Sequence, residues 1–128
     1  MEHHDLTGTI IGCAMAVHRA LGPGFLERVY GRALGHELTK AGLAFECETP
    51  IQVWYDGVVV GDFYADMLVE RCILIENKAV QSLLTAHEVQ LENYLTATHI
   101  DVGLVLNFGA NRLQYKRQAR TYRPSGTV

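Results

Sequence analysis

The chain has 128 residues, of which 48% are hydrophobic and 20% charged, and its net charge is −3. This length suits one domain with a single core, and the composition is ordinary for a soluble globular protein. No apolar run approaches the roughly 18 residues of a membrane helix and no basic-then-apolar leader opens the chain, so we expect no membrane partner. A negatively charged chain has no global positive field to attract nucleic acid. The net charge therefore weakens the case for a nucleic-acid-binding protein without excluding it.

The three cysteines, Cys13, Cys47 and Cys72, are scattered through apolar segments and form no CxxC pair. This usage is typical of buried thiols in a reducing compartment, so we expect a cytoplasmic protein without a zinc site. We expect a single domain over residues 1–128, with fraying ends at 1–5 and 121–128.

Two helices are predicted at the start of the chain. Apolar residues recur at helical spacing from Leu6 to Leu21, and a second helix is expected from just after Gly24 to about Ala41. His18 lies close to the apolar stripe of the first helix. It is interpreted either as a core or capping histidine or as a supporting partner of an acidic site.

Glu27 opens the second helix and is seven residues before Leu34. This spacing predicts that its carboxylate projects from the apolar side of the first turn. An acid near a helix N-terminus is electrostatically favourable in itself. An inward carboxylate could also belong to a metal site, so both interpretations stay open.

An antiparallel meander is predicted in the middle of the chain. An extended segment from Ala44 to Tyr55 meets Asp56-Gly57, a strong hairpin signal, and the return strand starts at Val58. Gly61 in that strand indicates a bulge or a close approach of another group. The return strand continues to Val69, and a turn at Glu70-Arg71 leads into the next strand.

Three charged residues follow this last turn in a pattern that suggests chemistry. If the loop is Glu70 to Cys72, then Asp66 lies opposite Glu76 on the neighbouring strand, with Cβ atoms roughly 5 Å apart. Two such carboxylates repel each other unless a cation or a proton lies between them. Lys78 shares the face of Glu76, since side chains two apart on a strand point the same way. A divalent metal with the lysine amine beside it is the simplest arrangement.

A third helix is expected from Thr85 to about Thr98, opened by a Thr85-x-x-Glu88 capping box. Gln90 and Tyr94 lie along one side of it at four-residue spacing. The plain interpretation is a polar residue packed beside a core tyrosine.

Two final strands complete the predicted sheet. Val102 to Phe108 is apolar enough to be buried on both faces, and the crossover helix makes it parallel to the Glu76 strand. An edge strand should run from Arg112 to about Arg117. Basic residues gather here, and they form either a surface that follows a phosphate backbone or a solvated strand and tail: Arg112, Lys116, Arg117, Arg120 and Arg123.

The acid followed by Glu-x-Lys on the next strand resembles the motif of the metal-dependent PD-(D/E)xK nuclease superfamily, with Ala65 in place of the proline. The stretch Gly24-Phe-Leu-Glu27-Arg-Val-Tyr30 is similar to the signature of the small bacterial GxxExxY proteins, a branch placed in that superfamily. Further elements also fit this branch, and the similarity runs from about residue 8 to about residue 120: Val17 to Gly24, Gln90 with Tyr94, and Asn107-Phe108-Gly109.

The resemblance implies an α/β fold with a restriction-endonuclease-like mixed sheet, two N-terminal helices and a crossover helix. It implies a nuclease that hydrolyses DNA or RNA with Mg²⁺ or Mn²⁺. Asp66, Glu76 and the backbone carbonyl of Asn77 would hold the ion, and Glu27 would complete the acidic set. Lys78 would orient the nucleophile or stabilise charge on the phosphate, and Gln90 would position a water or a phosphate. The resemblance also implies that His18, Tyr30 and Tyr94 support the acidic residues. Four basic residues would bind nucleic acid: Arg112, Lys116, Arg117 and Arg120.

Two other classes of function remain open. The chain could keep the fold without catalysis and bind nucleic acid or a protein partner, with Asp66, Glu76 and Lys78 as a buried charged cluster. It could also be a structural subunit that dimerises through an exposed sheet edge at Trp54 and Tyr55. A nuclease this small and acidic could in turn need a companion DNA-binding protein.

Overall fold

A computed structural model describes residues 3–121 of the chain. Its helices and strands follow in this order: α1 (His4–Leu21), α2 (Glu27–Lys40), β1 (Phe45–Tyr55), β2 (Val58–Val69), β3 (Ile73–Lys78), α3 (Thr85–Thr98), β4 (Val102–Asn107) and β5 (Gln114–Ala119). The strands form one five-stranded sheet within this range, in the order β1-β2-β3-β4-β5. The β3–β4 pair is parallel and the other pairs are antiparallel.

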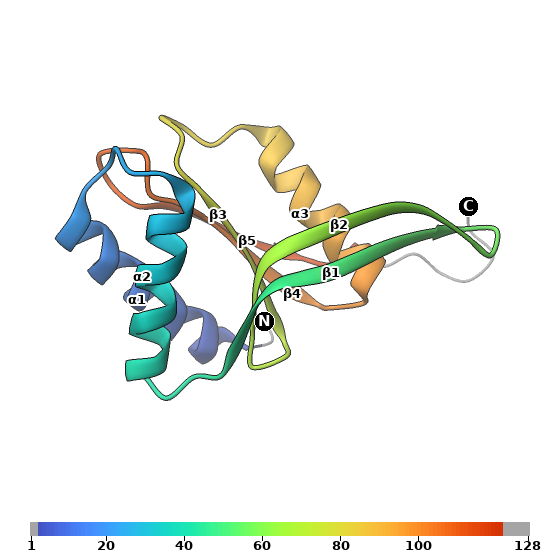
Figure 1. Cartoon of the computed structure of the whole chain (residues 1–128), viewed down its shortest axis with the longest axis horizontal. Helices are drawn as coiled ribbons and strands as arrows, with labels where there is room; N and C mark the ends of the chain where they lie inside the picture. The colour runs from blue at the N-terminus through green and yellow to red at the C-terminus, as the bar shows by residue number, and fades with distance from the viewer. Residues whose placement is uncertain (1–2, 122–128) are drawn as a thin grey trace.

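The sheet lies between two layers of helices (Figure 1). Helices α1 and α2 cover one face, and α3 covers the other, where it contacts β1, β4 and β5. Because α3 connects β3 to β4 across the sheet, those two strands run parallel, as the crossover predicted. The mixed α/β sheet with two N-terminal helices and a crossover helix is confirmed. None of the described helices is long and apolar enough to cross a membrane.

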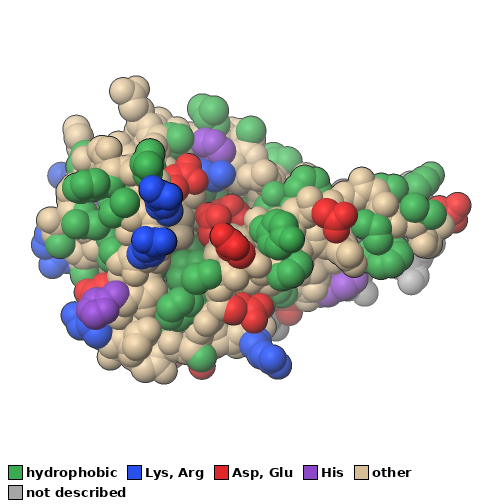
Figure 2. Space-filling model, in the orientation of Figure 1, with side chains coloured by type: hydrophobic (Ala, Val, Ile, Leu, Met, Phe, Trp, Pro, Cys, Tyr) green, Lys and Arg blue, Asp and Glu red, His purple; other side chains and the backbone are tan. Residues whose placement is uncertain are grey.

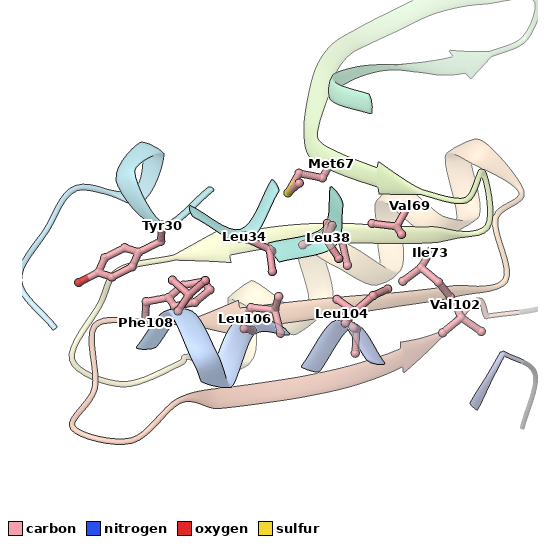
Figure 3. Packing of buried hydrophobic residues seen from close by; sticks show 14 residues of the cluster. Tyr30, Leu34, Leu38, Met67, Val69, Ile73, Val102, Leu104, Leu106 and Phe108 are labelled. Atoms are coloured by element: carbon pink, nitrogen blue, oxygen red, sulfur yellow. The ribbon is translucent and has the colours of Figure 1, made fainter. Parts of the chain in front are cut away.

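Each face of the sheet has its own hydrophobic core. On the α1/α2 face, Leu34 and Leu38 of α2 pack over Leu104 and Leu106 of β4 (Figure 3). On the α3 face, the buried side chains come from the helix and from the central strands: Leu91 and Leu95 with Leu74 and Val105. Burying apolar side chains on both faces explains the continuous apolar runs of β3 and β4.

Tyr30 anchors the loop between the two N-terminal helices. Its ring is buried and stacks on Phe108, with centroids 4.8 Å apart. Its hydroxyl group donates a hydrogen bond to the carbonyl of Gly22 and accepts one from the amide of Phe25. The tyrosine thereby fixes the glycine-rich loop against the core, and its outward-pointing hydroxyl is visible in Figure 3.

Both predicted hairpin turns are present. Asp56 and Gly57 adopt φ of 52° and 76°, and Glu70 and Arg71 adopt φ of 51° and 57°. Consecutive left-handed residues match the right-handed twist of the flanking strands. The pairing of β1 with β2 shifts register next to Gly61, which agrees with the bulge predicted there.

Two local predictions are corrected. The capping box is wrong: Thr85 is already the first helical residue, and the amide of Leu84 instead donates to Nδ1 of His87 at 3.1 Å. Glu88 accepts a hydrogen bond from the side-chain amide of Gln118. Residues 4 and 5 are helical and not frayed, since α1 begins at His4. The prediction for the C-terminal end falls on 122–128, outside the described residues.

Candidate metal and catalytic site

The site forms where the β2–β3 ladder ends. The loop from Glu70 to Cys72 pairs Val69 with Ile73, and the ladder continues to the pair of Met67 with Ile75. This is the register predicted from the loop length. The next position along the two strands is occupied by Asp66 and Glu76.

At that position the side chains replace the backbone ladder. The amide of Asn77 donates to Oδ2 of Asp66 at 2.7 Å, and the amide of Asp66 donates to Oε1 of Glu76 at 3.3 Å. Each carboxylate is therefore held by the backbone of the opposite strand. The two acids are fixed side by side where the regular pairing of β2 and β3 stops.

The two carboxyl groups are costly to ionise together. Glu76 is 5% exposed, and its pKa is raised to about 8, first by burial and then by the charge of Asp66. Burial also raises the pKa of Asp66, against the opposing effects of the Asn77 amide and Lys78. At neutral pH the pair therefore retains a proton or requires a cation.

Lys78 supplies positive charge from the end of β3. Its charge lowers the pKa of both Asp66 and Glu76. Among residues 3–121 it forms no ion pair with either carboxylate at 4.0 Å or less. The half-buried Lys78 is thus near the acids without forming an ion pair with them.

The segment after Lys78 is fixed by the Asn107-Phe108-Gly109 element. The side chain of Asn107 accepts from the amide of Val80 at 3.0 Å and donates to its carbonyl at 2.9 Å. The amide of Phe108 donates to the carbonyl of Lys78. A Cβ at Gly109 would lie 2.4 Å from the backbone nitrogen of Val80, so only glycine allows this approach. These contacts give the element a structural role in holding the end of β3.

Helix α3 carries Gln90 and Tyr94, and it brings Tyr94 near the two acids. The side-chain amide of Gln90 donates to the hydroxyl of Tyr94 at 3.2 Å. The pKa of Tyr94 is raised by burial and by the charges of Glu76 and Asp66. The tyrosine hydroxyl therefore lies within electrostatic range of both acids.

Two more carboxylates, those of Glu27 and Glu48, lie near Asp66 in a cavity that residues of α2 border. Glu27 is exposed, contrary to the inward position that its spacing predicted, because it is the first residue of α2. It nevertheless lines a cavity of about 800 Å³ together with Asp66 and Glu48. The charge of Glu27 raises the pKa of Glu76, and the charge of Glu48 raises that of Asp66.

Glu48 was missed in the sequence. A regular hairpin from the Asp56-Gly57 turn would put Cys47, not Glu48, opposite Asp66. The register shift between Val53 and Trp54 moves β1 by one residue, so Cys47 pairs with Met67 and Glu48 comes opposite Asp66. Glu48 itself has φ of 54° and leaves the regular pairing. The bulge signal at Gly61 was the only clue to this shift.

Arginines of α2 border the same cavity. Arg28 and Arg32, which are four residues apart and exposed, line it along with the acids. Figure 2 shows acidic side chains near the centre of this face, with Lys and Arg side chains beside them over α2. The acidic site is thus flanked by positive charge.

The donor set suits a hard divalent cation. Mg²⁺ is commonly held by one or two carboxylates together with waters and substrate phosphates, without a complete protein cage. Buried Glu76 and half-buried Asp66 offer two such carboxylates. In the described part of the chain, no three His, Cys, Asp or Glu residues are grouped closely enough to hold a metal by themselves. A bound ion would therefore need ligands from water or substrate.

Two predicted supporting residues have structural contacts elsewhere. Nε2 of His18 is 2.8 Å from the carbonyl of Ala110, so the histidine links α1 to the loop after β4. Tyr30 fixes the Gly22–Phe25 loop through its hydroxyl group. These contacts agree with the plain interpretation of a satisfied capping histidine.

The predicted basic surface is divided between the two faces of β5. Lys116 pairs with Val105 of the α3-face core, whereas Arg117 pairs with Leu104 of the opposite core. Arg117 contacts Nδ1 of His4, and Arg120 forms an ion pair with Asp101 at 2.9 Å. Arg112 is exposed in the loop before β5, and Arg123 lies outside the described residues.

Two acids that meet where the pairing of two strands ends, with a lysine two residues after the second acid, form a pattern that is typical of nuclease-like proteins. The family model of the PD-(D/E)XK nuclease superfamily matches residues 4–119, and the chain belongs to this superfamily. No functionally curated protein matches the chain.

Among solved structures, the chain is similar to one described as the crystal structure of SSO0001, with a TM-score of 0.59 and 22% sequence identity. The match covers 75% of this chain and 50% of that one, so this chain corresponds to about half of the other protein's length. At this identity the similarity establishes the shared fold.

Proposed function

We propose that the chain is a divalent-metal-dependent nuclease that hydrolyses phosphodiester bonds in DNA or RNA. The observation that carries the proposal is the Asp66–Glu76 pair, in which burial raises the pKa of both carboxyl groups. Among residues 3–121, no lysine or arginine forms an ion pair with either carboxylate. Lys78 lies close enough for its charge to lower the pKa of both carboxyl groups. Membership of the superfamily, which usually hydrolyses nucleic acids, supports the same function.

Asp66, Glu76 and the backbone carbonyl of Asn77 would hold Mg²⁺ or Mn²⁺, and Glu27 would join them directly or through water. Glu48, on the far side of Asp66, is a further candidate for a water-mediated contact. Bound there, the ion would polarise the phosphate and lower the pKa of an attacking water.

The chain's own residues would orient the reaction. The Asn77 amide keeps the Asp66 carboxylate turned toward Glu76. The Lys78 ammonium group, not engaged in an ion pair with the acids, would stabilise negative charge that develops on the phosphate. Gln90, oriented by its hydrogen bond to Tyr94, would position a water or a phosphate oxygen.

We also assign the chain to the GxxExxY branch of the superfamily. Two of the signature residues have separate tasks in this structure. Tyr30 holds the loop before α2, and Glu27 then begins that helix at the edge of the acidic cavity. This division of tasks supports a signature that serves both the fold and the site.

The proposal is tested by cleavage of end-labelled DNA and RNA, each in single-stranded and duplex form, with Mn²⁺ and with Mg²⁺. Wild type should cleave at least one substrate, and Lys78→Met should lose cleavage by about 100-fold or more while retaining metal binding. Lys40→Met, which removes an exposed lysine at the end of α2, is the matched control and should cleave normally. Equal cleavage by wild type and Lys78→Met would contradict the assigned role of the lysine.

One observation favours a second function, a non-catalytic binding protein with the nuclease fold. The raised pKa of Glu76 allows a shared proton to satisfy the acidic pair without any metal. Such a protein would bind nucleic acid equally well with and without metal, and the Asp66→Asn variant would leave that affinity unchanged.

A further inference from the structure

The β1–β2 hairpin extends beyond the rest of the molecule as an arm, and α3 lies beneath its base (Figure 1). Between the arm and the helix is a groove of about 1070 Å³. Its chemically most informative lining residues are Gln52, Trp54, Phe63, Gln90, Asn93 and Tyr94.

The groove combines exposed aromatic surface with neutral hydrogen-bonding groups. Trp54 is 61% exposed and Phe63 is 43% exposed, and the Phe63 ring lies 5.6 Å from that of Tyr94. Gln52 and Asn93 contribute amide groups that both donate and accept. No Asp, Glu, Lys or Arg is among the described residues that line the groove.

This composition fits nucleobases better than phosphates. A phosphate backbone requires cationic partners, and no Lys or Arg is among the described residues that line the groove. Nucleobases are neutral planar rings with hydrogen-bonding edges, and they stack on aromatic side chains. The arginines that border the acidic cavity, Arg28 and Arg32, lie on the other side of the site and supply the charge that a backbone needs.

The groove approaches the proposed catalytic site at Tyr94. Gln90 and Tyr94 line the groove, and the Tyr94 hydroxyl is within electrostatic range of Glu76 and Asp66. A base stacked beside Phe63 would therefore place its own phosphate close to the acidic pair. In a duplex both faces of each base are covered by its neighbours, so a paired base could not enter.

We propose that the groove between the arm and α3 binds unpaired bases, and that the substrate is single-stranded nucleic acid or the single-stranded part of a longer one. The inference rests on the proposed function for the position of the scissile phosphate. The binding step itself does not require metal or cleavage, so the two can be tested separately.

Trp54 is the one tryptophan in the sequence, so its fluorescence reports on the groove directly. Wild type is titrated with an oligothymidylate and with a matched duplex, in buffer containing EDTA. The single strand should quench the Trp54 emission, and the duplex should leave it unchanged. Phe63→Ala should weaken the single-strand affinity by about tenfold, as expected for the loss of one stacking partner.

Tyr64→Ala is the matched control. Tyr64 is an exposed aromatic residue on the same strand, but it does not line the groove, because successive side chains on a strand point to opposite faces. Its substitution should leave the quenching unchanged.

Absence of quenching by any single strand, or equal quenching by the duplex, would overturn the inference. So would a Trp54 emission that changes with protein concentration alone together with early elution on sizing, since a second copy would then occupy the groove. Cleavage of duplex without quenching would leave the nuclease proposal intact and refute only the groove. Quenching without metal binding or cleavage would do the reverse.

Discussion

Replacing Glu76 by glutamine should stabilise the metal-free protein. The pKa of Glu76 in the folded protein is about 8, against 4.5 as its ordinary value, and burial is the main cause. Between these two pH values the folded state keeps a proton that the unfolded state has lost. Stability therefore falls as pH rises from about 4.5 to about 8, and it levels off above that.

The size of the effect follows from the shift. At about 1.4 kcal/mol per pKa unit, retaining Glu76 costs roughly 3 kcal/mol at pH 7 and roughly 5 kcal/mol at pH 9. A glutamine carries no charge, and its side-chain oxygen can still accept from the Asp66 amide. Glu76→Gln should recover most of this free energy at neutral and alkaline pH, and almost none at pH 4.

Urea unfolding of EDTA-treated wild type and Glu76→Gln at pH 4, 7 and 9 measures the difference. The gap between the two unfolding free energies should widen steadily with pH. Glu88→Gln, an acid on α3 that takes part in one hydrogen bond with Gln118, is the control and should show no such widening. If the difference between the unfolding free energies of wild type and Glu76→Gln is the same at all three pH values, the description of a buried acid that resists ionisation is refuted.

Three further outcomes follow from the same structure. Metal affinity should rise with pH up to about 8, because the ion must displace the proton held by Glu76. Calorimetry at pH 6 and pH 8 measures this rise, and equal affinities at the two pH values would contradict it. Gly109→Ala should lower the free energy of unfolding in urea by several kcal/mol, because its Cβ would overlap the Ala79–Val80 backbone. Gly12→Ala is the control: its Cβ would meet nothing within 4 Å, so it should be neutral or stabilise α1 by up to about 1 kcal/mol. Leu106→Ala should cost about 2–5 kcal/mol in the same assay because Leu106 is fully buried in the α1/α2-face core, and a loss below about 1 kcal/mol would show that this core is wrongly described.

Much of the fold was readable from local patterns. The 3.6-residue period, the Asp56-Gly57 turn and the apolar strand from Val102 each specify an element through short-range physics. The position of Asp66 beside Glu76 was also predictable, because a loop of fixed length sets the register of two strands. These features depend on residues close together in the chain.

The parts that were missed depend on register and packing over longer distances. One extra residue in the β1–β2 ladder moved Glu48 opposite Asp66. The exposure of Glu27 reflects where α2 begins, and that is set by the loop that Tyr30 fixes. The basic residues of β5 are close in sequence, but the alternation of a strand sends Lys116 and Arg117 to opposite faces.

The groove beneath the arm was likewise not visible in the sequence. From the sequence, Trp54 was expected on an exposed sheet edge and Gln90 was expected to position a water or a phosphate, whereas Phe63 was only one residue of the return strand. Their proximity results from the angle at which α3 packs against the bulged hairpin, and no local pattern encodes that angle.

The central claim is that Asp66 and Glu76 form a divalent-metal site, and calorimetric titration with Mn²⁺ and Mg²⁺ tests it most directly. Wild type should bind the metal, Asp66→Asn and Glu76→Gln should each abolish binding, and the control Glu88→Gln should bind as wild type does. Absence of binding to wild type at millimolar metal would contradict the account and leave the two acids as a proton-sharing structural pair.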